Sequence, residues 1–289
     1  TPLYDSLTTN VPHPFMAYPS FSFPPETPLY PPASTVLQYL NSYATHFDTR
    51  KHVRVNTTVR LVDWDAALSR WRVRTSATGA PPDDAGEEAL FDLVIVANGH
   101  YNQPYIPPTP GLTSWIAGGK ATHVAWYRHA RHVGDTVLVV GAGYSGQDVV
   151  AEMRAVCATL IHSYSSAACA ATAVTGAGAV VQPRPRVAEY LDPTEGRVRF
   201  EDGSTAAGVD HCFLATGYEH ALPFLSRGIM EPGPPPPTAA VPAPRLYNSA
   251  HHVFPLAMHL FPLTTAFPPT RMCFLALPYY TTPLALAEA

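Results

Sequence analysis

The sequence predicts an α/β protein built on a Rossmann-like, dinucleotide-binding βαβ unit, and three observations carry this prediction. An apolar run at 137–140 leads directly into the glycine-rich turn GAGYSG at 141–146. An amphipathic segment follows the turn, and a second apolar run occupies 159–163. Strand, turn, helix and strand thus follow one another at the spacing of a βαβ unit, whose right-handed crossover places the two strands side by side.

The glycine turn matches the pattern G-x-G-x-x-G, and each glycine has a physical role. Gly141 allows the tight turn after the strand, Gly143 lets the backbone approach a pyrophosphate, and Gly146 lets the helix pack closely on the strand. Free N–H groups and the positive end of the helix dipole then face the phosphates. We therefore expect Gly141, Gly143, Tyr144, Ser145 and Gly146 to bind a dinucleotide.

Two other interpretations of this turn are weaker. A tight turn without a ligand is one, because glycines after strands are common. A nucleophile elbow, G-x-S-x-G around Ser145, is the other, but Gln147 stands where that motif has its last glycine.

The end of the second strand bears on the choice of dinucleotide. An NAD site usually ends this strand in an acid that binds the ribose 2′-hydroxyl. Here 163–166 reads Ser-Tyr-Ser-Ser, without a carboxylate. This favours NADP over NAD, although the arginine expected for a 2′-phosphate does not follow the strand either.

Upstream of this unit, the sequence first predicts an extended loop and a helix. Eight prolines between 12 and 32 interrupt every candidate helix in that stretch. A helix then begins near Ser34 or Thr35, either of which can cap it. Its apolar face is expected to hold Val36, Leu37, Leu40, Tyr43 and Phe47.

Strands are predicted next. Alternating, β-branched runs at 53–61 and 71–75 indicate a hairpin or meander, with 64–69 as the connection. The polar stretch 78–88 predicts an exposed loop. The continuous apolar run 90–97 favours a strand buried on both faces, as in a parallel sheet.

Downstream of the glycine unit, further strands and a linker are predicted. Residues 197–200 with the turn 201–204 indicate a hairpin, and 210–215 indicates another buried strand. The proline-rich stretch 232–244 predicts a flexible or polyproline linker. Residues 271–277 form the last strand candidate.

Composition excludes several classes of function. The 289 residues carry a formal net charge of −4 without a basic stripe, which argues against nucleic acid as a partner. No apolar run is long enough for a membrane-spanning helix, so we expect a cytoplasmic protein. The four cysteines, including Cys157 and Cys169, form no C-x-x-C pair, and the thirteen histidines show no ligand spacing, so no metal site is expected.

Several motifs occur together in one order, and through them the chain resembles the flavin-containing monooxygenase family, most closely its fungal-type members. They are LTTNVPHPFMAYPSF at 7–21, VIVANGHYNQPYIP at 94–107, AGGKATHVAWYR at 117–128, VLVVGAGYSG at 137–146, FLATGYEHALPFL at 213–225, LYNSAHHVFP at 246–255 and LPYYTTPLALAEA at 277–289. The third matches most of the F-x-G-x-x-x-H-x-x-x-Y fingerprint through Gly119, His123 and Tyr127.

The resemblance implies a two-dinucleotide-binding-domain flavoprotein that binds FAD and NADP. A partial FAD-binding domain would span 1–130, an inserted NADP-binding domain 131–225, and a return to the FAD-binding domain 226–289. In the family, NADPH reduces the flavin, which forms a C4a-hydroperoxide with oxygen and oxygenates a soft nitrogen or sulfur atom of a small molecule. The cofactor carries this chemistry, so no acid–base triad is needed.

The resemblance also assigns roles to individual residues. Asn10 corresponds to the residue beside flavin and NADP that helps hold the hydroperoxide, because an amide can donate and accept there without bringing a charge. Further cofactor contacts are expected on the FAD side and at a strand exit, from Val59, Ala97, Asn98, Gly99, Thr216, Gly217 and Tyr218. His123 and Tyr127 are expected to be structural residues that couple the two cofactor domains.

Departures from the family keep alternatives open. The family has a first G-x-G-x-x-G that binds the FAD pyrophosphate, whereas this sequence has only the NADP-type turn. Together with the start at Thr1 and the end at Ala289, this predicts a fragment or truncated product. One alternative is therefore an inactive NADP-binding remnant, and another, kept by Trp126 beside the fingerprint tyrosine, is a Baeyer–Villiger-type monooxygenase.

Overall fold

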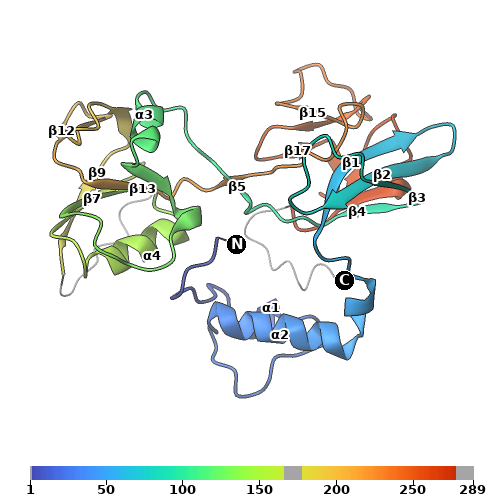
Figure 1. Cartoon of the computed structure of the whole chain (residues 1–289), viewed down its shortest axis with the longest axis horizontal. Coiled ribbons are helices and arrows are strands. Elements are labelled where there is room, and N and C mark those ends of the chain that lie inside the picture. The colour runs from blue at the N-terminus through green and yellow to red at the C-terminus, as the bar shows by residue number, and fades with distance from the viewer. Residues whose placement is uncertain (1, 166–177, 278–289) are drawn as a thin grey trace. The chain divides into compact units, whose positions relative to one another are not determined.

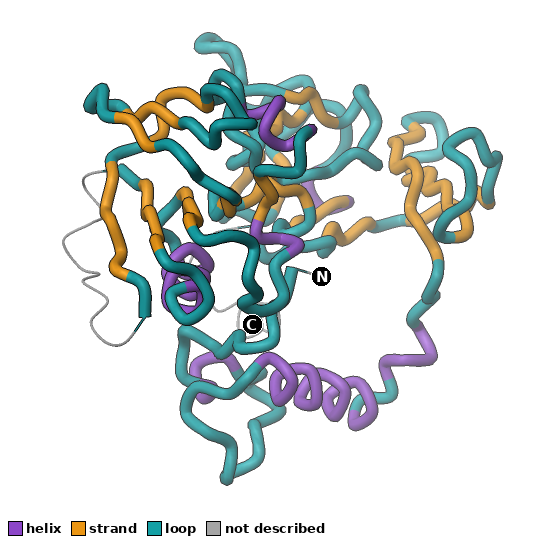
Figure 2. The backbone as a smooth tube through the Cα atoms, turned by 60° about the vertical axis from the view of Figure 1, so that its left-hand side comes forward, coloured by secondary structure: helices purple, strands orange, loops and turns teal. Residues whose placement is uncertain are grey.

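The computed structural model describes residues 2–165 and 178–277, which form two compact units. Unit 1 consists of Thr1–Leu7 and Tyr101–Tyr218, and unit 2 of Thr8–His100 and Glu219–Ala289. Ser166, Cys169 and the family-like segment 278–289 lie outside the described residues. Figure 2 shows that strands and loops make up most of the chain.

Unit 1 is organised around a parallel five-stranded sheet in the order β6-β13-β7-β8-β9 (Figure 1). This confirms the predicted βαβ unit, because β7 and β8 are neighbours and helix α4 connects them. The strands are β6 (Ala121–His123), β7 (Thr136–Val140), β8 (Thr159–Ser163), β9 (Val180–Arg184) and β13 (His211–Leu214), and α4 spans Tyr144–Met153.

The two faces of this sheet bury different side chains, as the alternation of a strand requires. Val137 and Val139 pack on one face against Val149, Val150 and Met153 of α4. The other face, which includes Leu138 and Ile161, is covered by a short helix and a small antiparallel sheet. These elements are α3 (Leu112–Ala117), β10 (Val187–Tyr190), β11 (Val198–Phe200) and β12 (Thr205–Ala206), so the predicted hairpin after residue 197 is confirmed.

Two short strands, β5 (Gln103–Pro104) and β14 (Tyr218–Glu219), pair where the chain passes between the units. A 3-10 helix, η2, spans Val124–Trp126 directly after β6.

Unit 2 contains mainly small sheets. Its largest is the antiparallel meander β1 (Thr57–Asp65), β2 (Arg70–Ala77) and β3 (Glu87–Phe91). Trp71 of this meander is fully buried in a core with Leu246, Met272 and Phe274. The remaining strands are β4 (Val94–Val96), β15 (Met230–Pro232), β16 (Leu246–Asn248), β17 (Val253–Phe254), β18 (Leu256–Ala257), β19 (Phe261–Pro262) and β20 (Met272–Phe274).

The helices of unit 2 are α1 (His13–Met16), α2 (Ala33–His46) and the 3-10 helices η1 (Thr49–His52) and η4 (Pro269–Arg271). The predicted helix α2 is present, but Pro32 occupies its N-cap position and no side chain caps it. Its buried residue is Tyr39, which stacks on Phe23 at a centroid distance of 3.8 Å. The predicted apolar face is partly right, because Tyr43 and Phe47 pack on the aromatic loop before the helix. It is wrong for Leu37 and Leu40, which are exposed, and it omitted the buried Tyr39.

Three other expectations are corrected. The run 90–97 is two strands, because the chain leaves β3 after Phe91 and β4 pairs in parallel with β20. This run is also largely exposed, including Leu93 and Ile95. Residues Glu87 and Glu88, expected in a loop, belong to β3. The proline-rich 232–244 is not a free linker at its end, since Ala243 is buried and its backbone bonds to Leu263 and Thr265.

Within the described residues, no helix has the length and apolar character to cross a membrane. The same residues contain no group of three or more His, Cys, Asp or Glu side chains arranged to hold a metal ion.

Candidate functional site

The glycine turn lies between β7 and α4, where the chain needs two glycines for steric reasons. Gly141 has a φ of +110°, and a Cβ there would lie 2.2 Å from the carbonyl oxygen of Ala215. A Cβ on Gly146 would lie 2.2 Å from the carbonyl oxygen of Gly141. These two residues therefore close the turn and bring helix and strand together, as the sequence predicted.

Gly143 differs from the other two glycines. A Cβ added there would meet nothing within 4 Å, and its φ of −67° is open to any residue. Gly143 is the N-cap of α4, so the first N–H groups of the helix, which have no intrahelical partner, begin here. Gly143 and Tyr144 are exposed, whereas Gly146 is buried. The open backbone at Gly143 fits the close approach of a pyrophosphate.

A histidine that the sequence analysis missed holds this turn in place. The His162 side chain, on the neighbouring strand β8, donates from Nε2 to the carbonyl oxygen of Gly141 over 2.9 Å. His162 is buried, and burial lowers its pKa, so the ring stays neutral and donates from one nitrogen. Only the parallel pairing of β7 and β8, which places Ser163 opposite Val140, brings it near the turn.

The exit of β13 lies beside the glycine turn, because β13 pairs in parallel with β7 and places Leu214 opposite Val140. Thr216 and Gly217 follow on this exit. The Thr216 hydroxyl donates to the carbonyl oxygen of Tyr105 over 2.6 Å. The N–H of Tyr105 donates in turn to the carbonyl oxygen of Gly217 over 2.9 Å. Thr216 and Gly217 thus fasten the connector of β5 to the edge of the sheet where ligands of such folds bind.

The fingerprint histidine and Tyr218 pack together within unit 1. His123 is 1% exposed, and its ring lies 5.2 Å from that of Tyr218. His123 is the N-cap of the 3-10 helix η2, and its Nδ1 accepts a hydrogen bond from the N–H of Ala125. Burial lowers the pKa of His123 to about 4, so the ring is neutral at physiological pH. His123 therefore serves as a neutral packing and capping residue within unit 1.

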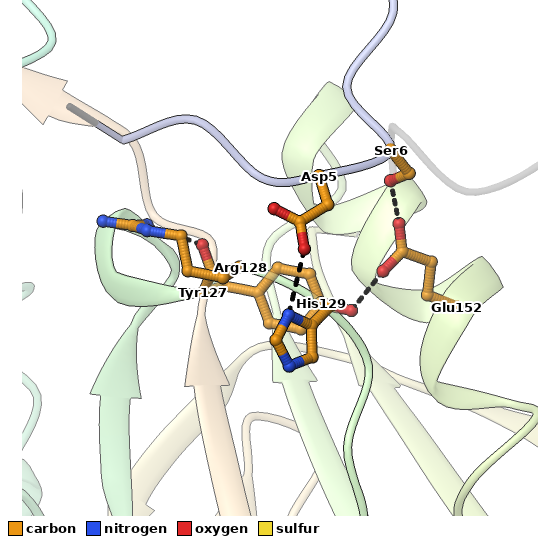
Figure 3. Close-up of polar contacts among 6 residues, drawn as sticks. All are labelled: Asp5, Ser6, Tyr127, Arg128, His129 and Glu152. Carbon is orange, nitrogen blue, oxygen red and sulfur yellow. Dashed lines mark hydrogen bonds and ion pairs between the residues drawn. The ribbon is translucent and has the colours of Figure 1, made fainter.

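The fingerprint tyrosine takes part in a cluster of polar contacts on α4, shown in Figure 3. The Tyr127 hydroxyl donates to Glu152 over 2.5 Å, and the Ser6 hydroxyl donates to the other oxygen of the same carboxylate. Tyr4 donates to Asp148, one turn earlier on the helix. His129 Nδ1 lies within hydrogen-bond distance of Asp5 Oδ2, at 3.1 Å. We call residues 2–7, which make these contacts from the start of the chain, the N-terminal strap.

The remaining predicted site residues belong to unit 2. Asn10 is exposed in a bend, and Val59 is 41% exposed in β1 beside a bulge. Ala97, Asn98 and Gly99 follow β4 and are exposed; Asn98 donates from Nδ2 to the carbonyl oxygen of Ala221 over 3.1 Å. The predicted site residues thus fall into two groups, one in each unit.

The residues present fit the two cofactors to different extents. The turn at 141–146 fits a dinucleotide pyrophosphate, because it combines steric closure at Gly141 and Gly146 with open backbone at Gly143. For the FAD pyrophosphate, the sequence contains no second G-x-G-x-x-G turn.

Comparison with known proteins places this chain in a family. The family model described as flavin-binding monooxygenase-like matches residues 1–182. Flavin-containing monooxygenase FMO GS-OX5 of Arabidopsis thaliana is 31% identical over 236 residues, which cover 78% of this chain and 48% of that protein. Trimethylamine monooxygenase of Methylocella silvestris is 30% identical over 240 residues, with the same two coverages. The chain spans about half the length of these curated relatives.

Solved structures agree with this assignment. S-allyl-L-cysteine S-oxygenase from Allium sativum superposes with a TM-score of 0.77 at 25% identity, covering 100% of this chain and 61% of that one. The fold, the glycine turn and the family model therefore lead to one conclusion. The chain belongs to the flavin-binding monooxygenase-like family.

Proposed function

We propose that this chain acts in a flavin-dependent monooxygenase that uses NADPH to oxygenate a soft nitrogen or sulfur atom of a small molecule. The observation that carries the proposal is the glycine turn, sterically closed at Gly141 and Gly146 and open at Gly143, in a chain that belongs to this family. Relatives named for trimethylamine and for S-allyl-L-cysteine support nitrogen and sulfur as the atoms oxidised.

The overall reaction balances with one equivalent each of NADPH and oxygen. NADPH, a proton, O₂ and the substrate give NADP⁺, water and the substrate carrying one added oxygen atom. The bound flavin supplies the electron transfer and oxygen activation, and the protein supplies binding, orientation and exclusion of water.

In unit 1, the chain's own groups bind and orient NADPH. The open backbone at Gly143 and the helix N–H groups at Tyr144 and Ser145 hold the pyrophosphate. His162 keeps Gly141 in the conformation that exposes these groups. Thr216 and Tyr218 shape the adjacent strand exit, and neutral His123 packs beneath Tyr218 without adding charge.

In unit 2, the candidate flavin-side groups are neutral. Asn10 can donate and accept hydrogen bonds beside reacting oxygen without bringing a charge. Ala97, Asn98 and Gly99 offer exposed backbone after β4, and Val59 offers backbone at the bulge of β1.

The alternative of an NADP-binding remnant rests on one observation, the single G-x-G-x-x-G in the sequence. One experiment separates the two functions. The chain is mixed with FAD, freed of unbound flavin, and its visible spectrum is recorded before and after NADPH is added without oxygen. We expect a yellow protein whose flavin absorbance NADPH bleaches. A chain that binds NADPH but stays colourless would contradict flavin binding by this chain alone and would favour the remnant.

A further inference from the structure

We infer that Arg184 and Arg186 form the binding site for the 2′-phosphate of NADPH. The sequence around the end of β8 offers no cation for this group, yet the fold brings these two arginines there. The inference rests on the proposed function, because it deepens the NADP site of unit 1.

The distribution of charged residues along the sequence limits which residues can bind the 2′-phosphate. Between Arg154 and Arg184 the sequence contains no lysine or arginine, and between Glu152 and Glu189 it contains no acid. Arg154 lies at the C-terminal end of α4, and its Nε donates to the carbonyl oxygen of Ala179 over 3.0 Å. Without a carboxylate for a ribose 2′-hydroxyl, this stretch does not select NAD.

The pairing of β8 with β9 places the two arginines. These strands are parallel, so both end at the same edge of the sheet, the edge of the glycine turn. Arg184 is the direct partner of Ser163, the last residue of β8. Nucleotides bind outside the carboxyl ends of parallel strands, with the 2′-position near the end of the second strand of the βαβ unit.

Hydrogen bonds fix the segment 184–186 to this position. The N–H of Tyr164 donates to the carbonyl oxygen of Arg184 over 3.1 Å, and the Ser163 hydroxyl donates to that of Pro185 over 2.9 Å. The N–H of Glu201 donates to the carbonyl oxygen of Arg186 over 2.9 Å. The backbone of both arginines is therefore held in place before any ligand binds, which reduces the ordering cost of binding.

The Arg184 side chain has an unused donor. Its guanidinium lies 6.0 Å from the ring centroid of Phe200, and its Nε is buried without a hydrogen-bond partner among the described residues. A buried donor without an acceptor destabilises the folded chain. A phosphate oxygen is an acceptor that a guanidinium binds strongly and bidentately.

Asp202 is an acidic neighbour of Arg184, but among the described residues it forms no ion pair with the Arg184 guanidinium within 4.0 Å. The Ser204 hydroxyl and N–H are the main groups that lower the pKa of Asp202, and the positive charge of Arg184 adds a smaller effect. Asp202 Oδ1 already accepts the N–H and hydroxyl of Ser204, at 2.9 and 2.6 Å. Arg186 is exposed and adds a second positive charge.

Calorimetric titration with 2′,5′-ADP and with 5′-ADP tests the inference without flavin or nicotinamide. We expect the full chain to bind 2′,5′-ADP at least tenfold more tightly. Arg184→Gln and Arg186→Gln should each weaken the affinity for 2′,5′-ADP by roughly 10–100-fold, which corresponds to about 1.4–2.8 kcal/mol. Neither change should alter the affinity for 5′-ADP.

Arg199→Gln is the matched control, because Arg199 lies in β11 of the adjoining sheet and pairs on the surface with Glu189. Arg186→Gln decides the question if Arg184→Gln disturbs the packing on Phe200, which thermal unfolding would reveal. Equal affinities of the parent for both ligands, or an unchanged ratio in Arg186→Gln, would overturn the inference and leave the proposed function standing. Failure of the parent to bind either ligand would instead contradict the proposed NADP site at the glycine turn.

Discussion

His162 donates a hydrogen bond from Nε2 to the carbonyl oxygen of Gly141, so a side chain of the second strand fixes the turn that follows the first. A substitution at His162 removes this bond without changing the residues of the turn itself. Such a variant therefore tests how the conformation of the turn affects ligand binding.

The first prediction concerns this bond. His162→Leu keeps an apolar side chain of similar bulk but leaves the Gly141 carbonyl without its donor, which should cost about 1–3 kcal/mol of unfolding free energy. NADPH affinity should fall as well, because Gly141 no longer holds the turn open at Gly143. Urea unfolding and calorimetry measure the two effects; unchanged NADPH affinity would show that the turn does not depend on this bond.

The second prediction concerns Gly143→Ala. The added methyl group meets nothing within 4 Å, and the backbone conformation suits alanine, so stability should change by less than about 1 kcal/mol. NADPH affinity should fall at least tenfold, since the methyl group occupies the space that a pyrophosphate needs. Equal affinity in the variant would mean that the pyrophosphate does not lie over Gly143.

The third prediction uses Gly146→Ala as the contrast. Its Cβ would lie 2.2 Å from the carbonyl oxygen of Gly141, so strand and helix must separate. We expect a loss of stability of about 1–3 kcal/mol or more from overpacking, measured by thermal unfolding. A variant as stable as the parent would contradict the close packing of α4 on β7.

The fourth prediction follows from buried histidines. Burial lowers the pKa values of His123 and His220 to about 4, from an ordinary value of 6.5. The unfolded chain therefore takes up these protons first, and the stability present above pH 6.5 is lost as the pH falls towards 4. His123 alone contributes at most about 3 kcal/mol to this loss.

Urea unfolding at pH 7.5 and at pH 5 tests this dependence. His123→Gln should reduce the difference in unfolding free energy between the two conditions, because it removes one titrating group. Equal stability of the parent at both pH values would show that the histidines titrate normally in the folded chain.

The fifth prediction concerns the carboxylate shared by the N-terminal strap and the fingerprint. Tyr127→Phe removes the hydroxyl that donates to Glu152 and should cost about 1 kcal/mol or more. Glu152→Gln affects both donors, Ser6 and Tyr127, so combining the two changes should give less than the sum of their separate effects. Full additivity in thermal unfolding would contradict the shared contact.

The elements that the sequence predicted best are those set by local pattern. The βαβ unit could be read from the run before Gly141, the glycines and the apolar run ending at Ser163. The further motifs along the sequence extended this prediction from a dinucleotide-binding fold to the flavin-containing monooxygenase family. The prediction was wrong where an apolar run fitted either one buried strand or two shorter strands. The run 90–97 was predicted as one buried strand. Instead, β3 pairs with β2 as far as Phe91, and β4 begins at Val94, where it pairs with β20.

The sequence did not predict the positions of residues whose contacts lie on a neighbouring strand. His162 stands in an apolar strand and shows no motif, and only the register of β8 against β7 puts it beneath Gly141. Arg184 lies twenty-one positions after Ser163 in sequence but directly beside it in the sheet. Long-range pairing decides both positions, and no periodicity within one segment reports it.

The N-terminal strap has a consequence for dividing the protein into parts. Residues 101–218 look like a continuous cofactor-binding module, but a piece cut at those positions lacks Tyr4 and Ser6. Asp148 and Glu152 on α4 would then lose the hydroxyl donors that the strap supplies. An excised module should therefore include residues 2–7, either as a fused extension or as a separate peptide. The change in stability of the module when the separate peptide binds would measure how much the strap stabilises α4.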